Sequence, residues 1–136
     1  MTAAVSSQEL PVVSDADVVK VRQAVRALAL EARLGLVDQT KVVTAASELA
    51  RNTLIHGGGG RAVLELLDDG LRRGVRAVFV DEGPGIPDVD LALTDGYTTG
   101  GGLGLGLSGT RRLVDEFELD TRVREGTRVS MTKWGR

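Results

Sequence analysis

Two pairs of apolar segments with alternating side chains, each pair joined by a short turn, set the strongest limit on how this chain can fold. The first pair is RAVLELL (61–67) and GVRAVFVD (74–81), and the second pair is FELDTRV (117–123) and TRVSMTKW (127–134). Period-two alternation of apolar residues is typical of a strand with one buried face. Because strands joined by so few residues pair antiparallel, the chain should contain an antiparallel sheet.

Two longer segments have apolar residues at helical spacing. The first helix should begin after Ser14, where Ser14-Asp15-Ala16-Asp17 reads as a capping box, and end at Gly35 in a left-handed conformation. The second helix should run from Asp38 to about His56, where four glycines stop it. The expected buried positions are Val18, Val21, Val25, Leu28 and Ala32 in the first helix and Val42, Ala46, Leu49, Ala50 and Thr53 in the second.

The remaining elements are a short first strand at residues 8–13 and a third helix at about 108–116, after a glycine-rich segment at 82–107. The order is therefore β-α-α-β-β-loop-α-β-β. We expect an α+β fold, a two-layer sandwich with a mixed, mostly antiparallel sheet and its helices on one face. A length of 136 residues fits a single domain, residues 1–136.

Composition removes several classes of function. The chain has no cysteine, which excludes disulfides, thiolate zinc sites and cysteine nucleophiles. A net charge of −2 argues against a nucleic-acid or membrane partner selected by bulk charge. The sequence has neither a signal peptide nor a run of 18 apolar residues, so we expect a cytoplasmic protein.

Glu48 and Asn52 form the first candidate site. Residues four apart on a helix point the same way, and these two lie beside the apolar stripe, where a ligand could reach them. Carboxylate and amide oxygens are hard donors that suit Mg²⁺. Taken alone, such a pair is more often the solvated flank of a helix.

The segment DEGPGI (81–86) places a second candidate, Asp81, at the end of an apolar strand. Gly83 and Gly85 follow it, at points where the backbone can turn sharply and approach another group closely. A carboxylate there could accept a hydrogen bond from an exocyclic amine above the sheet. A plain strand-ending turn has the same composition.

The third candidate is GGGLGLGLSG (100–109), in which Gly104, Gly106 and Gly109 have the spacing of a dinucleotide-binding turn. That motif needs a preceding strand and a second parallel strand ending in an acidic residue, and both are missing. Regular leucines argue against a linker. Backbone amides that lead into a helix favour phosphate oxygens, so we expect a lid over a ligand.

Taken in order, four motifs resemble those of the GHKL ATP-binding family over nearly the whole chain. SELARN (47–52), DEGPGI (81–86) and TTGGGLGLGLSGTRRL (98–113) match its N, G1 and G2 boxes, and EGT (125–127) follows. Within that family the chain is similar to the small serine kinases of bacterial partner-switching modules, in their stress-response branch. The resemblance implies the GHKL fold, with ATP and Mg²⁺ as ligands.

The resemblance also implies roles for single residues. Asn52 would bind Mg²⁺, and Glu48 would act as general base or order the metal's water. Asp81 would accept from the adenine amino group, while Gly83 and Gly85 let the backbone approach the base. The other matches are Gly102, Gly104 and Gly106 in the lid and Thr127 near the adenine.

The implied function is that of an ATP-dependent protein-serine/threonine kinase. Its substrate would be a STAS-domain antagonist protein, and on release it would bind and activate a PP2C-type phosphatase. An anti-sigma factor that sequesters a sigma subunit is the first alternative, and an ATP-binding domain without activity is another. A detached histidine-kinase domain is disfavoured, because the sole histidine, His56, lies in the N-box helix.

Overall fold

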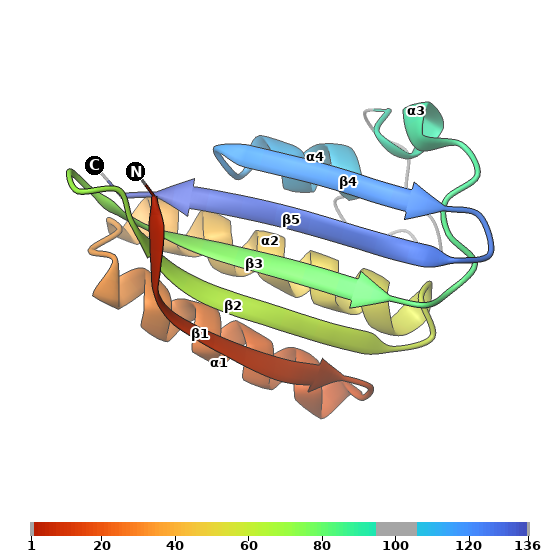
Figure 1. The fold of residues 1–136 in the computed structure, drawn as a ribbon, viewed down its shortest axis with the longest axis horizontal. Helices are drawn as coiled ribbons and strands as arrows, with labels where there is room; N and C mark the ends of the chain where they lie inside the picture. The colour runs from red at the N-terminus through yellow and green to blue at the C-terminus, as the bar shows by residue number, and fades with distance from the viewer. Residues whose placement is uncertain (1, 95–105, 136) are drawn as a thin grey trace.

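Five strands are present in the described part of the chain, residues 2–94 and 106–135 of this computed structural model. They form one sheet in the order β1-β2-β3-β5-β4 (Figure 1). Each pairing between neighbours is antiparallel, so the sheet is not mixed over these residues, and both predicted hairpins are confirmed. The strands are β1 (Ala3–Val12), β2 (Gly60–Asp68), β3 (Arg73–Asp81), β4 (Glu116–Arg122) and β5 (Gly126–Trp134).

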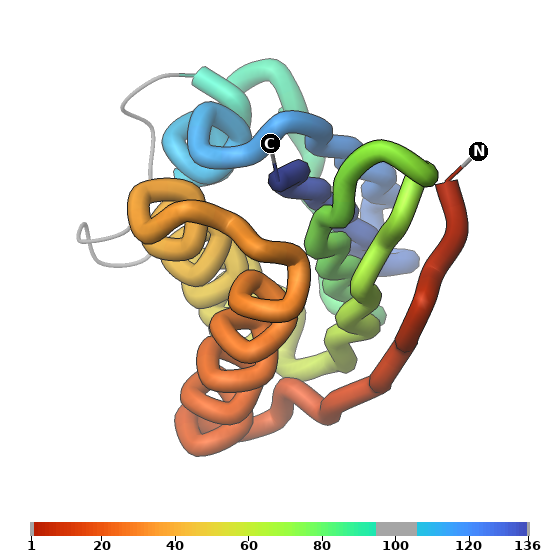
Figure 2. The backbone as a smooth tube through the Cα atoms, turned by 90° about the vertical axis from the view of Figure 1, so that its left-hand side faces the viewer, coloured from red at the N-terminus to blue at the C-terminus, as the bar shows by residue number. Residues whose placement is uncertain are grey.

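The helices lie on one face of this sheet, as Figure 2 shows from the side. The long helices α1 (Asp15–Glu31) and α2 (Leu36–Ile55) pack against each other, and α4 (Gly106–Arg112) lies next to α2. A single short turn, α3 (Val89–Ala92), contacts α4. The predicted two-layer α+β sandwich is therefore confirmed. In the described residues, no helix combines the length and the apolar character needed to cross a membrane.

The core between the two layers consists of the predicted apolar stripes. All ten positions expected to be buried in the two long helices are buried. The inward faces of the strands meet them, with Leu64, Phe79 and Met131 almost completely inaccessible to solvent. Ser14 caps α1 as expected, since the Asp17 N–H donates to Ser14 Oγ at 3.2 Å. The Asp17 carboxylate completes the cap one residue earlier than in a standard capping box, because it accepts from the Val13 N–H at 3.0 Å.

The connection between α1 and α2 differs from the expected one. Arg33, not Gly35, takes the left-handed conformation, with φ of 60°. The Arg33 N–H donates to the Leu30 carbonyl and the Leu34 N–H donates to the Ala29 carbonyl, which is the Schellman pattern for a helix end. Gly35 instead has φ of −64° and is the N-cap of α2, which begins at Leu36, two residues before the expected start. Burial of Leu34 fixes where the turn falls.

Three other elements also differ from the expected ones. β1 begins at Ala3, five residues before the expected start, and pairs with β2 along its whole length. Its residues are mostly exposed at the sheet edge, so they lack the apolar alternation that marks a strand. α4 spans Gly106–Arg112 and not 108–116, because Glu116 already begins β4. The turn α3 was not expected within the glycine-rich segment.

A buried ammonium group joins the layers at the end of the sheet where β5 finishes. Lys133 is buried, and its Nζ lies 3.5 Å from Asp38 Oδ1 in α2 and 3.5 Å from Asp115 Oδ1, just before β4. The other oxygen of Asp115 accepts a hydrogen bond from the Trp134 N–H at 2.7 Å. The start of α2 is thereby held to the end of β5.

The reassigned α1–α2 connection leads to a stability prediction. Gly35→Ser should raise the free energy of unfolding by about 0.5–1 kcal/mol, because serine can cap α2 and restricts the unfolded chain. A Cβ at Gly35 meets no atom within 4 Å. Gly70→Ser is the matched control, since Gly70 also has open space but φ of 92°. It should lower stability by about 1 kcal/mol in the same denaturant titration. Destabilisation by Gly35→Ser would contradict the assignment.

Candidate functional site

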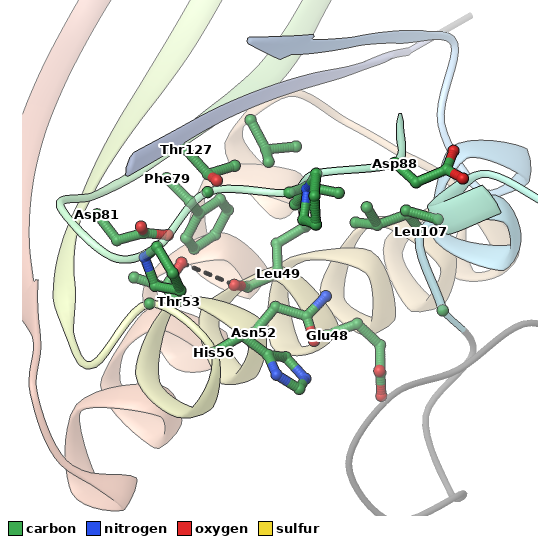
Figure 3. A pocket seen from close by; sticks show the side chains of 18 of the residues that line it. Glu48, Leu49, Asn52, Thr53, His56, Phe79, Asp81, Asp88, Leu107 and Thr127 are labelled. Atoms are coloured by element: carbon green, nitrogen blue, oxygen red, sulfur yellow. Dashed lines mark hydrogen bonds between the residues drawn. The ribbon is translucent and has the colours of Figure 1, made fainter. Parts of the chain in front are cut away.

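A pocket of about 360 Å³ lies where the second half of α2 meets the end of β3, the start of β5 and the loop after β3 (Figure 3). It gathers residues from segments far apart in the sequence. The predicted site residues that line it are Glu48, Asn52, Asp81, Gly85, Gly106 and Thr127. Gly83 adjoins it through a contact with Asp81. Gly102 and Gly104 lie outside the described residues.

Apolar side chains supply much of the remaining lining. The buried side chains of Leu49 and Phe79 line it. Ile86, Leu107 and Val129 complete the apolar lining. Apolar walls around a few convergent polar groups are typical of small-molecule sites. The pocket therefore suits a ligand that combines an apolar part with polar groups.

The helix α2 positions Glu48 and Asn52 on one side of the pocket. Their four-residue spacing puts both on the same face, and both side chains are half-buried. Figure 3 shows them on α2, away from Asp81 and Thr127 at the other end. The helix ends just beyond, where the Asn52 carbonyl accepts from the N–H groups of His56 and Gly57.

The oxygens of Glu48 and Asn52 are of the kind that Mg²⁺ prefers. Within the residues described, no group of three or more histidine, cysteine or acidic side chains is arranged to hold a metal. A Mg²⁺ ion would therefore need further oxygens from a bound ligand and from water. The donor set fits a metal held jointly by protein and ligand, since Mg²⁺ commonly retains such ligands.

At the other end of the pocket, Asp81 is held by two glycines. Its Oδ1 accepts from the Gly83 N–H at 2.9 Å. A Cβ on Gly57 would come under 3.0 Å from the Asp81 side chain, and a Cβ on Gly83 would come as close to the Gly57 backbone. Only glycine allows this approach. The sequence predicts Gly57 only as the point where the second helix stops, and no local pattern indicates its contact with Asp81.

Thr127 enters the pocket from β5, beside Asp81, to which it is paired in the sheet. Two glycines bring the neighbouring backbones together here. Gly85 has φ of 76° and lies against the Arg122 carbonyl, while Gly126 has φ of 119° and lies against the Asp81 carbonyl. The loop after β3 is therefore packed directly on the β4–β5 hairpin.

The charge of the pocket is unusual for a site that would take an anionic ligand. The ionisable side chains on its described lining are the carboxylates of Glu48, Asp81 and Asp88 and the imidazole of His56. No lysine or arginine is among these lining residues. A polyphosphate would consequently depend on backbone N–H groups and on a metal cation for charge neutralisation.

Residues 13–133 match the family model of the histidine kinase-like ATPase domain. The chain belongs to this family. It is 42% identical over 123 residues to the serine/threonine-protein kinase RsbT of Bacillus subtilis, covering 90% of this chain and 92% of that protein. It is also 32% identical over 99 residues to an anti-sigma F factor of Clostridium novyi, covering 69% of each. The expected family is confirmed, and these relatives support a partner-switching kinase.

Two solved structures share the fold. The RsbU and RsbW domains of Rv1364c from Mycobacterium tuberculosis align with a TM-score of 0.66 and 22% identity, over 97% of this chain and 33% of that one. The SiaB–SiaC complex from Pseudomonas aeruginosa aligns with a TM-score of 0.55 and 16% identity, over 96% and 90%. At these identities the likeness concerns the fold, which is the ATPase-type sandwich expected from the sequence.

The contact between Gly57 and Asp81 can be tested directly. Gly57→Ala should lower the free energy of unfolding by about 1–3 kcal/mol, because the added methyl group overlaps the Asp81 side chain. It should also move the Asp81 carboxyl carbon signal in NMR spectra. Gly58→Ala is the control: its φ of 74° makes it costly too, but its Cβ meets no atom within 4 Å. An unmoved Asp81 signal in Gly57→Ala would refute the contact.

Proposed function

We propose that this chain, as a single domain over residues 1–136, is a Mg²⁺-dependent protein kinase that transfers phosphate from ATP to a serine or threonine of a STAS-domain antagonist protein. The observation that carries the proposal is that one pocket joins Asp81 at one end to Glu48 and Asn52 at the other. The 42% identity to a protein-serine/threonine kinase supports the reaction class.

Asp81 and Thr127 would receive the adenine. A carboxylate at the bottom of an apolar cleft can accept a hydrogen bond from an amino group on a flat base. Gly83 and Gly85 let the loop after β3 pack against the backbones of Gly57 and Arg122, where a Cβ would overlap. This packing holds the loop backbone beside Asp81, where the base would lie. Phe79 and Val129 supply apolar surface next to Asp81 and Thr127.

Glu48 and Asn52 would lie at the phosphates. The Asn52 carboxamide oxygen is suited to hold Mg²⁺, and Glu48 to hold or orient a water on it. The metal, when bound, supplies the positive charge that the described lining of the pocket lacks. Gly106 begins α4 at the pocket edge, and together with Gly102 and Gly104 we assign it to a lid that contributes backbone N–H groups.

Phosphoryl transfer requires positioning and charge neutralisation more than covalent catalysis. The substrate hydroxyl oxygen forms a bond to the γ-phosphorus as the bond from that phosphorus to the β,γ-bridging oxygen breaks, and ADP leaves. Glu48 accepts the hydroxyl proton. It is half-buried at the pocket rim, where an incoming side chain can reach it.

The assignment leads to a prediction for transfer. With Mg-ATP and a STAS-domain substrate, the full chain should form phosphoserine or phosphothreonine, detected by mass spectrometry. Asn52→Ala should lower transfer by at least a hundredfold, and chelation of divalent metal should abolish it, because the phosphates lose their cation. Thr40→Ala, an exposed change on the same helix, is the control and should be fully active. Undiminished transfer by Asn52→Ala, or transfer without metal, would exclude the proposal.

Glu48→Gln separates chemistry from binding. The amide keeps the size of the side chain but cannot take a proton, so kcat should fall by about 10²–10⁴-fold while the Kd for Mg-ATP changes little. Single-turnover transfer and calorimetry measure the two quantities. If Kd rises and kcat stays the same, Glu48 acts as a metal ligand and not as a base.

A second candidate function is that of an anti-sigma factor, favoured by the similarity to the anti-sigma F factors. In that case the chain would hold a sigma subunit and ATP would tune the complex. We propose instead that the chain has a PP2C-type phosphatase as its second partner, besides the STAS-domain protein. The kinase binds and activates this phosphatase when the kinase is released. Gel filtration with each purified partner distinguishes the two: a complex with the phosphatase supports the first function, and a stoichiometric complex with a sigma subunit the second.

A further inference from the structure

A threonine outside the pocket lining, Thr121 on β4, lies at the centre of a hydrogen-bond network at the Asp81 end. Its Oγ1 is 2.8 Å from Thr127 Oγ1, the hydroxyl that lines the pocket. The same oxygen accepts from the Ile86 N–H at 2.9 Å and donates to the Gly126 carbonyl at 3.2 Å. Thr121 and Thr127 are paired directly across the two strands. One hydroxyl group thus joins the loop after β3, the β4–β5 hairpin and Thr127.

Counting protons fixes the direction of the bond between the two threonines. A hydroxyl group carries one hydrogen and two acceptor lone pairs. The Gly126 carbonyl can only accept, so its bond takes the single hydrogen of Thr121. The Ile86 N–H can only donate, so it takes one lone pair. With the hydrogen of Thr121 on the Gly126 carbonyl, the 2.8 Å contact is a bond that Thr127 donates and Thr121 accepts.

We propose that Thr121 is a positioning residue that makes Thr127 present only acceptor lone pairs to the pocket. The Thr127 hydrogen is directed to Thr121, away from the ligand. The Asp81 carboxylate beside it is likewise an acceptor. This end of the pocket thereby selects a nucleotide whose base carries an amino group and rejects a base with a carbonyl oxygen at the same position. The inference rests on the proposed nucleotide function and deepens it.

The discrimination follows from what each base edge offers. An amino group donates to both acceptors. A carbonyl oxygen in its place faces the lone pairs of Thr127 and of Asp81 with no hydrogen between them, and such unpaired buried polar groups are costly. Without the Thr121 hydroxyl, Thr127 can rotate and donate to that carbonyl oxygen. Selectivity should therefore weaken although Thr127 and Asp81 are both still present.

The test compares Mg-ATP with Mg-ITP. ATP carries an amino group at C6 and ITP a carbonyl oxygen, and ITP also carries a hydrogen on N1, so the readout is the change in preference between variants and not the preference of one variant alone. Calorimetry on the full chain gives both Kd values for each variant. Thr121→Val should lower the preference for ATP over ITP by about tenfold, the size expected when a hydrogen bond of this kind is lost. Thr121→Ser keeps the hydroxyl and should restore the preference of the wild type.

Thr127→Val provides the decisive background. If Thr121 acts through Thr127, adding Thr121→Val to Thr127→Val should leave the ATP-to-ITP preference unchanged, because the two effects are not additive. Thr132→Val is the matched control on β5, on the opposite face from Thr127, and should change neither Kd. Melting temperatures of all variants show which are folded. If Thr121→Val does not fold, the test depends on Thr121→Ser. A tenfold loss of the ATP-to-ITP preference in Thr121→Ser overturns the proposal.

Two further results overturn the inference. The first is an unchanged preference in folded Thr121→Val while Thr127→Val lowers it, which leaves the kinase proposal intact. The second is that Thr121→Val lowers the ATP-to-ITP preference equally in the wild-type chain and in Thr127→Val. Thr121 would then act on the structure of the site and not through Thr127. If the wild-type chain binds neither nucleotide in the presence of Mg²⁺, the proposed function itself fails and the inference fails with it.

Discussion

Backbone segments meet at one end of the sheet at distances that no side chain would allow. A Cβ on Gly57, Gly60, Gly83 or Gly126 would come under 3.0 Å from a neighbouring backbone atom or from the Asp81 side chain. The end of α2, the end of β3 and the β4–β5 hairpin can therefore converge. The pocket depends on this convergence, because each of these elements brings a different polar group to it. The high glycine content of the chain thus has a structural reason beyond the glycine-rich segment that first draws attention.

The two ends of the pocket are built on different principles. At the α2 end, Glu48 and Asn52 are placed by helix geometry alone, and their side chains are open to a ligand and a metal. At the Asp81 end, each polar group is held by neighbours: Asp81 by the Gly83 N–H, and Thr127 by Thr121. A rigid end suits recognition of a base, whose edge is fixed, while an open end suits phosphates, which change during the reaction. The same division would serve a binding module, so the chemistry at Glu48 decides between the two functions.

Much of this arrangement could be predicted from the sequence, because it is local. The hairpins, the capping box and the buried faces of α1 and α2 follow from spacing over a few residues, as does the shared face of Glu48 and Asn52. The parts that were missed depend on distant contacts. The left-handed residue is Arg33 because Leu34 is buried, and β1 is a full strand because β2 pairs with it. The contacts of Gly57 and Thr121 arise only when separate elements meet, so no local pattern indicates them.

The ion pairs of Lys133 with Asp38 and Asp115 act as a clamp that holds the start of α2 to the end of β5. This clamp fixes how the two elements are aligned along their lengths. The whole of α2 has 20 residues and the whole of β5 has 9. At about 1.5 Å per helical residue and about 3.3 Å per strand residue, both measure about 30 Å. The clamp aligns one pair of ends, so the equal lengths align the other pair, where Asn52 and Thr127 face the same pocket. One residue inserted in α2 between Asp38 and Glu48 would turn the helix by about 100° and carry the side chains of Glu48 and Asn52 out of the pocket.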